Sequence, residues 1–446
     1  SRPTPLTLDA VLARVDRASP KLMGTRLARG LAEAKRLEKS GAFDPSLNFK
    51  TERLEFINDL GKFKTKDSLQ PTVDVLSRQG AKLSGGFKAT RSDPAAIGRG
   101  VDEEGRGLVS VRVPLLRGAG VNEKSAAERQ ARLGYPAADA EIGLTRIELL
   151  SKAGAAYWDW ATAIRAARVA RDLGQLADDR AAQIQERSTS GDLPPIDSVE
   201  ARQEAQRRRG ALIKAEREIA KATFKLGLFL WQDDGGPAPL PAEAAMPASF
   251  PKPHPVQKPD RLALESAALA RRPELTRLLT DRAMASIDAE LAVNDRRPAV
   301  DLVFNTGKDS NPDAFDEVGK RLKAGVLIEV PLARRAATGR LRAARIKMQK
   351  IDLDRTSESQ RILTEVRDAA SAVDAAFERH SVASEELALA REMEQGERFR
   401  LEMGDSTLFL VNQRERARAE SELRLLEAFN EYHQALVTLR AVSGDL

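Results

Sequence analysis

The residues of this chain that could carry out chemistry are few and scattered. The three histidines, His254, His380 and His433, lack the spacing of a metal site and have no serine or aspartate partner in a strand–turn context. Ser84-Gly85-Gly86 is a glycine turn without the other residues of a phosphate loop. The absence of cysteine excludes a disulfide, a thiolate metal site and a cysteine nucleophile. The sequence therefore predicts no catalytic residue, no metal site and no cofactor, and we expect a protein that is not an enzyme.

Two glycine–aspartate pairs interrupt long stretches of helical sequence. Gly191 and Gly404 predict reversals between antiparallel helices, because glycine readily takes the left-handed backbone that ends a helix. Asp192, Asp197 and Asp405 lie at the same two turns, and each has two interpretations. Such a carboxylate can cap the free N–H groups at a helix start. If several copies assemble around one axis, it can instead form a ring that constricts a pore and filters cations.

Three more polar residues stand beside these turns. Arg187, Arg400 and Ser406 are candidates for contact with another protein. The alternative is that an arginine next to a turn is simply solvated, as most surface arginines are. Trp158, Trp160 and Trp231 occupy helical positions and are interpreted as packing residues. The candidate site is thus a pair of turns, which only the flanking helices can position.

Long helices are predicted around each turn. The chain contains no proline after Pro331 and no glycine between Gly339 and Gly396. Apolar residues there return every three or four positions, which is the period of an amphipathic helix. We expect helices over 334–403 and 406–442, and the first would measure about 100 Å at about 1.5 Å per residue. Helices of that length suit a tube or a rod better than a globular core.

Sequence with a period of two precedes the long helices in each half. Val109, Val111 and Val113 alternate with polar neighbours, as in a strand with one apolar face. We expect a strand hairpin within 45–116 and a second one within 299–332. Glycine- and aspartate-rich turns separate the strand candidates.

The two halves of the chain repeat one order of elements. Pro20 and Pro273 begin matching helices, and Pro45 and Pro298 precede matching strands, both at an offset of 253 residues (273 − 20; 298 − 45). Later matches have an offset of 217 (330 − 113), so the first hairpin region is longer by 253 − 217 = 36 residues. The predicted first repeat is 1–231, with helices in 5–40, the hairpin region 45–116 and long helices over 120–187 and 196–231. An extended linker is predicted over 232–259. The predicted second repeat is 260–446, with helices in 260–295, the hairpin 299–332 and long helices over 334–403 and 406–442.

Composition excludes other classes of protein. Aromatic residues make up only 4% of the chain, and the formal net charge of +6 is spread without a basic block. We therefore expect no nucleic-acid partner. No apolar run approaches the 18 residues of a transmembrane helix, so none is predicted.

Short motifs along nearly the whole chain together resemble the TolC-like outer-membrane efflux protein family, also called outer-membrane factors. Each motif is weak alone, and their shared order carries the resemblance. The motifs are Leu6-Thr7-Leu8-Asp9 with Ser19-Pro20, Val113 to Gly120, Arg187 with Gly191 and Leu193 to Asp197, Arg272-Pro273-Glu274-Leu275, and Gly404-Asp405-Ser406 leading to Gln413.

The resemblance implies a mainly α protein with a small β part. Three identical chains would join their very long antiparallel helices into an α-barrel across the periplasm, and their strand hairpins would contribute to one shared transmembrane β-barrel in the outer membrane of a Gram-negative cell. The implied function is a passive duct for efflux or type I secretion, opened by a periplasmic adaptor and an inner-membrane pump. The implied sites are Gly191 and Gly404 at the periplasmic tip, Asp192, Asp197 and Asp405 at the pore constriction, and Arg187, Arg400 and Ser406 at the adaptor contact.

The residues themselves support a shared barrel but leave one alternative. One hairpin per half gives too few strands to close a barrel, so several chains must share the closure in lipid. The alternative is a coiled-coil structural or adaptor protein that never enters a membrane. Charged residues spread over both faces of 47–57 favour it, since Lys or Arg facing lipid costs about 2–4 kcal/mol at the bilayer midplane.

Overall fold

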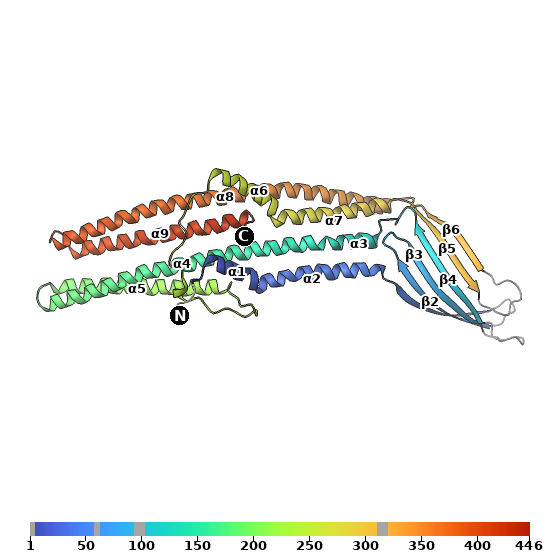
Figure 1. The fold of residues 1–446 in the computed structure, drawn as a ribbon, viewed down its shortest axis with the longest axis horizontal. Coiled ribbons are helices and arrows are strands. Elements are labelled where there is room, and N and C mark those ends of the chain that lie inside the picture. Colours follow the sequence, from blue (N-terminus) through green and yellow to red (C-terminus); the bar gives the residue numbers. More distant parts are fainter. Residues whose placement is uncertain (1–4, 58–62, 93–102, 310–319) are drawn as a thin grey trace. The chain divides into compact units, whose positions relative to one another are not determined.

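The computed structural model describes residues 5–57, 63–92, 103–309 and 320–446 (Figure 1). In this part of the chain helices dominate, and six strands form one sheet. The residues group into two compact units. The helical unit comprises Ser1–Leu27, Ala140–Leu275 and Thr356–Leu446, and the sheet unit comprises Ala28–Asp139 and Thr276–Arg355.

The elements follow the order that the periodicity predicts, with helices before and after each set of strands. The first half contains α1 (Leu8–Ala18), α2 (Pro20–Ser40), the 3-10 turn η1 (Gly41–Phe43), β1 (Ser46–Ile57), β2 (Phe63–Leu76), β3 (Lys82–Ser92), β4 (Glu103–Pro114), α3 (Glu123–Arg132), α4 (Gly134–Thr189) and α5 (Pro195–Gly227). The second half contains η2 (Glu243–Ala245), α6 (Lys258–Arg271), α7 (Pro273–Asp295), β5 (Ala299–Asp309), β6 (Lys320–Glu329), α8 (Arg335–Glu402) and α9 (Leu408–Val442).

Local sequence explains where several helices begin. Pro20, Pro195 and Pro273 are first residues of helices, where the missing N–H of proline would have had no partner in any case. Thr7 caps α1, and its Oγ1 accepts a hydrogen bond from the backbone N–H of Ala10 at 3.2 Å. These starts fix the helices whose apolar sides build the core.

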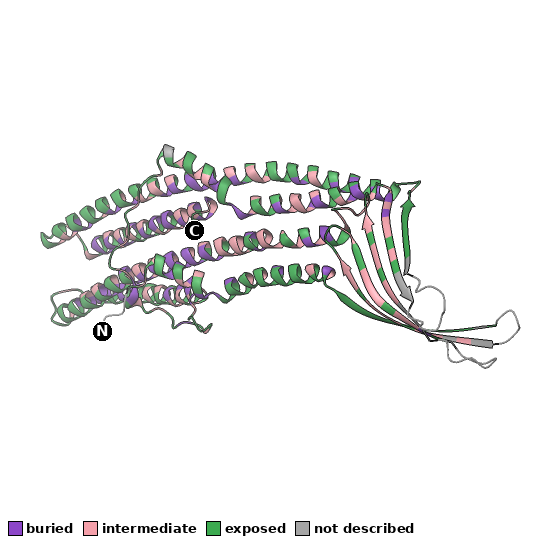
Figure 2. Cartoon of the chain, turned by 45° about the vertical axis from the view of Figure 1, so that its right-hand side comes forward, coloured by how far each residue is buried: buried purple, intermediate pink, exposed green. Residues whose placement is uncertain are grey.

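The core of the helical unit lies where α1, α4, α5 and α9 meet. Trp158 and Trp160 of α4 are buried there, beside many alanines that let the helix backbones approach closely. At Gly154 the approach is closest, because a Cβ atom would lie 2.8 Å from Cγ1 of Val437 in α9. A second cluster joins α6, α8 and α9 through residues such as Val366 and Tyr432. Figure 2 shows buried residues recurring along these helices.

The sheet unit contains an antiparallel meander in the order β1-β2-β3-β4-β5-β6. The prediction of one hairpin per half is wrong for the first half, which contributes four strands, β1 to β4. The additional residues of the first hairpin region form an extra hairpin, which consists of β2 and β3. Among the described helices, none contains an apolar segment long enough to cross a membrane.

Candidate pore-lining face and helical tips

One face of the sheet is apolar and open. A register row on this face joins Leu47, Val73, Gly85, Val109, Thr306 and Leu322 across the six strands. The large side chains of this row remain exposed, from 44% for Val73 to 78% for Leu322. Strands place alternate residues on opposite faces, so these rows repeat every second residue. The result is a broad apolar surface of exposed side chains.

The opposite face of the sheet is polar. Asp74 accepts hydrogen bonds from Nδ2 of Asn48 at 2.9 Å and from the hydroxyl of Ser84. Nearer the helices, Nε of Arg112 in β4 donates to the buried carboxylate of Asp301 in β5 at 2.8 Å. Cross-strand pairs of this kind stabilise a polar sheet surface. The sheet thus has two chemically distinct faces.

The charges of β1 divide between the two faces, as the poor alternation of 47–57 predicts. Lys50 and Glu52 lie on the polar face with Asn48, while Arg53 and Glu55 lie on the apolar side. Arg53 is paired there with Asp67 of β2, through hydrogen bonds of 2.8 and 3.0 Å. The pair neutralises the one described arginine on the apolar side of β1 and lies toward the end of the strand that is far from the helices.

The two turns at the ends of the helical hairpins have the same backbone design. Gly191 and Gly404 have φ of +88° and +85°. The N–H of Asp192 bonds the carbonyl of Arg187 at 2.9 Å, and the N–H of Asp405 bonds the carbonyl of Arg400 at 2.8 Å. Each is the six-to-one bond of a Schellman motif, which ends a helix on a left-handed glycine. The glycines are therefore required by the backbone of the reversals.

Replacing Gly404 with alanine is expected to destabilise the α8–α9 turn by about 1–2 kcal/mol, because a Cβ atom disfavours the left-handed region. Gly396 provides a matched control in the same helix. A Cβ atom there meets nothing within 4 Å, so Gly396→Ala should stabilise α8 by about 0.5–1 kcal/mol. Urea unfolding followed by far-UV circular dichroism measures both changes. Equal effects of the two substitutions would contradict the assigned turn.

The three predicted aspartates lie at the tips with open carboxylates. Asp192 and Asp405 are exposed and Asp197 is half-buried in the first turn of α5. α5 has no side-chain cap, and Thr407 caps α9 through a 3.4 Å bond from the N–H of Leu410. Among the described residues, no side-chain hydrogen bond or ion pair engages the three carboxylates. The three carboxylates do not cap either helix and are therefore free to bind another ligand.

The predicted contact residues differ in their surroundings. Arg187 is exposed, and the described residues provide it with no side-chain partner. Arg400 lies 3.8 Å from Glu397, donates to the backbone carbonyl of Asp405 at 3.4 Å and remains exposed. Ser406 donates its hydroxyl to Glu397 at 2.5 Å, so it holds the α8–α9 turn together. The arginines are thus available to a partner, whereas Ser406 already has a structural contact.

A buried ionic network near these tips is absent from the sequence-based expectations. Its centre is Glu415 of α9, whose side chain is 0% exposed. Arg180 of α4 contacts it at 2.6 Å, Arg208 of α5 at 2.8 Å and Arg398 of α8 at 2.9 Å. One carboxylate therefore ties together all four long helices of the helical unit. Glu204 extends the network by pairing with Arg208 of its own helix at 3.0 Å.

The charge state of Glu415 follows from two opposing effects on its pKa. Burial raises the pKa of this carboxyl, but hydrogen bonds and the charges of Arg180 and Arg208 outweigh burial and lower it. A lowered pKa in the folded state stabilises the fold above the unfolded value, which is about 4.5. That stabilisation is lost as the pH falls through the folded pKa.

The variant Glu415→Gln should reveal this pH dependence. The difference in urea midpoint between wild type and variant should be largest near pH 7. It should shrink as the pH falls from about 4.5 toward 2, because the wild-type carboxyl then also becomes neutral. Midpoints measured at a series of pH values provide the test, and a difference that stays constant with pH would contradict an ionised Glu415.

The segment between α5 and α6 is packed against the helical unit. Phe250 lies 5.4 Å from Trp158 and 5.8 Å from Phe429, measured between ring centroids. His433 stacks on Trp158 at 3.8 Å, and burial with the nearby charge of His380 lowers the pKa of His433 to about 4. His433 is therefore neutral at pH 7. The segment predicted as an extended linker is thus held against the helices by aromatic side chains.

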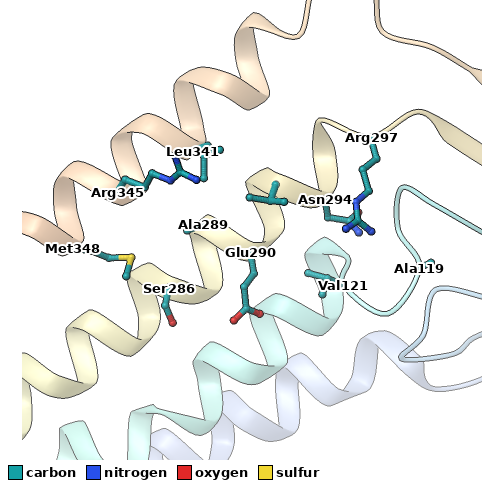
Figure 3. A pocket seen from close by; sticks show the side chains of 11 residues that line it. Ala119, Val121, Ser286, Ala289, Glu290, Asn294, Arg297, Leu341, Arg345 and Met348 are labelled. Atoms are coloured by element: carbon teal, nitrogen blue, oxygen red, sulfur yellow. The ribbon is translucent and has the colours of Figure 1, made fainter.

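A groove of about 450 Å³ lies in the sheet unit between α7, α8 and the segment before α3 (Figure 3). Leu341 and Met348 of α8 form part of one side, and Glu290 points from α7. Glu290 is already paired with Arg129 at 2.6 Å. The groove contains none of the predicted site residues, and its mixed lining indicates a gap between helices that is open to solvent.

Comparisons with known proteins agree with this geometry. The family model described as outer membrane efflux protein matches residues 264–445, and no curated protein sequence matches the chain significantly. A membrane protein from Pseudomonas aeruginosa is 17% identical, with a TM-score of 0.70 over 98% of this chain and 93% of that one.

Two solved outer-membrane channels have the same fold. The Neisseria gonorrhoeae MtrE channel in its open state is 15% identical, with a TM-score of 0.68 over 98% of this chain and 88% of that one. The Campylobacter jejuni CmeC channel is 11% identical, with a TM-score of 0.67 over 98% and 85%. Residues 264–445 therefore match the outer membrane efflux protein family, and the chain as a whole has the fold of these outer-membrane channels.

Proposed function

We propose that this protein is the outer-membrane duct of a tripartite efflux or type I secretion system. The observation that carries the proposal is the two-faced sheet, whose apolar face is left open beside two unpaired edges. In water such a face and such edges would aggregate. In an outer membrane the apolar face contacts lipid, the polar face lines a water-filled lumen, and copies of the chain pair their edges.

The helical unit supplies the periplasmic part of the duct. Its long helices carry charge throughout and form a bundle that belongs in water. Following the family resemblance, three chains assemble these helices into one α-barrel. The duct is passive and has no enzymatic activity, so energy comes from an inner-membrane pump that is linked through a periplasmic adaptor.

The tips provide the gate in this proposal. Three copies would place Asp192, Asp197 and Asp405 in rings at the narrow end, where unpaired carboxylates filter cations. The Glu415 network binds both helical hairpins of one chain into a single body. Opening then separates neighbouring copies and leaves each chain intact, which is a bistable rearrangement that the adaptor can bias.

Cell fractionation of the protein, expressed with an export signal, tests the proposed function. The detergent-extracted species should come from the outer membrane and have the mass of three chains. A water-soluble oligomer would overturn the duct and favour the alternative, a coiled-coil structural or adaptor protein outside the membrane.

The adaptor contact can be tested with the double variant Arg187→Glu and Arg400→Glu. Reversing two exposed charges at the tips should abolish co-purification of the adaptor and reduce export at least tenfold, while the oligomer stays intact. Arg277→Glu with Arg342→Glu is the matched control, because both arginines are exposed and lie in the sheet unit. Unchanged adaptor binding in the tip variant would remove these arginines from the contact.

A further inference from the structure

At the end of the sheet nearest the helices, the strands of one chain end at successively lower levels from β1 to β6. One register row joins Ser46, Asp74, Ser84, Ser110, Asn305 and Lys323. Toward the helices, β1 ends at this row, whereas β2 and β3 continue for two more residues (74 to 76; 84 to 82). β4 continues for four residues (110 to 114), and β5 and β6 continue for six (305 to 299; 323 to 329). The descent is monotonic across the sheet, and Figure 1 shows the strands side by side in this order.

This descent corresponds to the strand tilt of a closed barrel. Six residues over five strand-to-strand steps amount to about 4 Å of rise for each lateral step of about 4.8 Å. The strand ends can therefore be level around an axis only if the strands tilt by about 40° to it. Closed barrels have tilts of about 35–45°. The register of all six strands, including the extra hairpin, is thus already that of a barrel wall.

The two edges of the sheet fit each other in direction and in face. Six antiparallel strands leave β1 and β6 running in opposite directions, so β6 of one copy can continue the antiparallel order with β1 of the next. Setting the lower ends level brings Ser46 beside Glu329, which places Asn48 opposite Leu327 and Glu52 opposite Lys323. In that register polar face meets polar face, and the opposite charges of Glu52 and Lys323 face each other.

We propose that all six strands of each chain enter the barrel wall, with β6 of one copy paired to β1 of the next, so that three copies close an 18-stranded barrel. The inference rests on the proposed function. A barrel of this size has a diameter of about 35 Å between opposite backbones, against about 24 Å if the extra hairpin lay outside the wall. Barrels of 16–18 strands enclose an aqueous channel. The membrane end of this duct is then a wide polar pore.

The extra hairpin is fastened at its inner turn as a part of the wall would be. Arg78, in the β2–β3 turn, makes a bidentate pair with Glu128 of α3 at 2.9 and 3.0 Å, and Glu128 is only 5% exposed. The carbonyl of Arg78 accepts a bond from Asn122 at 3.1 Å. At Gly80 a Cβ atom would lie 2.3 Å from the carbonyl oxygen of Gly118, so the turn sits tightly on the loop before α3. A loosely attached hairpin would need none of these contacts.

The cysteine-free chain allows a direct test by cross-linking in the outer membrane. Asn48→Cys combined with Leu327→Cys should oxidise to covalent species of two and three chains. Pairing Asn48→Cys with Gly325→Cys or Glu329→Cys covers a shift of two residues either way. Ser84→Cys with Ser110→Cys is the control, because these neighbours in β3 and β4 should cross-link within one chain and leave its mass unchanged.

A second measurement does not depend on the edge register. A fluorophore attached at Leu83→Cys, on the apolar face of β3, should be quenched by brominated lipid, whereas one at Lys82→Cys on the polar face should not. A native species of three chains without β1–β6 cross-links and without quenching at Leu83 would overturn the 18-stranded wall and leave the duct in place. A soluble species would overturn both proposals.

Discussion

Replacing Glu415 with alanine is expected to lower the free energy of unfolding by about 3–5 kcal/mol, the cost of removing one partner from a buried ion pair. The carboxylate of Glu415 receives hydrogen bonds from Arg180 at 2.6 and 3.0 Å and from Arg208 at 2.8 Å. Arg208 is only 7% exposed, so without Glu415 its charge remains desolvated with fewer partners. The loss of stability comes mainly from these arginines, which remain buried without the carboxylate of Glu415.

Urea unfolding followed by tryptophan fluorescence measures this loss, because Trp158 and Trp160 are buried in the same helical unit. Glu420→Ala is the control on the same helix. Glu420 is exposed and no ion pair of the described residues includes it, so its removal should change stability by no more than about 0.5 kcal/mol. A loss below about 1 kcal/mol for Glu415→Ala would mean that water reaches the arginines and that the network does not bind the hairpins together.

Features that depend on a few neighbouring residues could be predicted from the sequence. The breaks at Ser19-Pro20 and Arg272-Pro273 appear where α2 and α7 begin, because proline fixes the first turn of a helix wherever it stands. The reversals at Gly191 and Gly404 likewise follow from a local requirement for a left-handed residue. The fold class follows from the order of such local signals.

The ionic network could not be predicted, because helical sequence does not distinguish a buried charge from a solvated one. Glu204 and Arg208 are spaced like an ordinary surface pair at i and i+4. Only the meeting of four helices buries them, and that depends on contacts between residues more than 200 positions apart, such as Arg208 with Glu415. The helical period reveals which side of a helix is apolar, and it carries no signal for polar groups that pair across a bundle.

The number of strands in the first half was predicted wrongly for a related reason. Strands β2 to β4 have a local period-two signal and β1 alternates poorly, but pairing is non-local, and the sequence does not show whether extra strand-like residues lengthen one hairpin or build another. Gly80 carried the missing information. Its φ of +94° makes the tight β2–β3 turn that begins the additional hairpin.

Replacing Val109 with arginine is expected to cost about 2–4 kcal/mol in the membrane, which is the penalty for a cationic side chain on the lipid face of a barrel near the bilayer midplane. Val109 lies in a row of apolar residues across the sheet and is 45% exposed in one chain. Its side chain has no polar neighbour in that row except Thr306, so an arginine there would have no carboxylate partner.

Ser110→Arg isolates the effect of the face, since Ser110 is the next residue of β4 and its row contains Asp74 and Lys323 on the polar side. Refolding into lipid vesicles followed by urea titration measures both variants, and fractionation reports how much protein reaches the outer membrane. Val109→Arg should lose stability and membrane yield, while Ser110→Arg should lose little of either, because water in the lumen solvates its charge. Equal losses at the two positions would show that the sheet does not separate lipid from water, whereas a loss confined to Ser110 would assign the two faces the other way round.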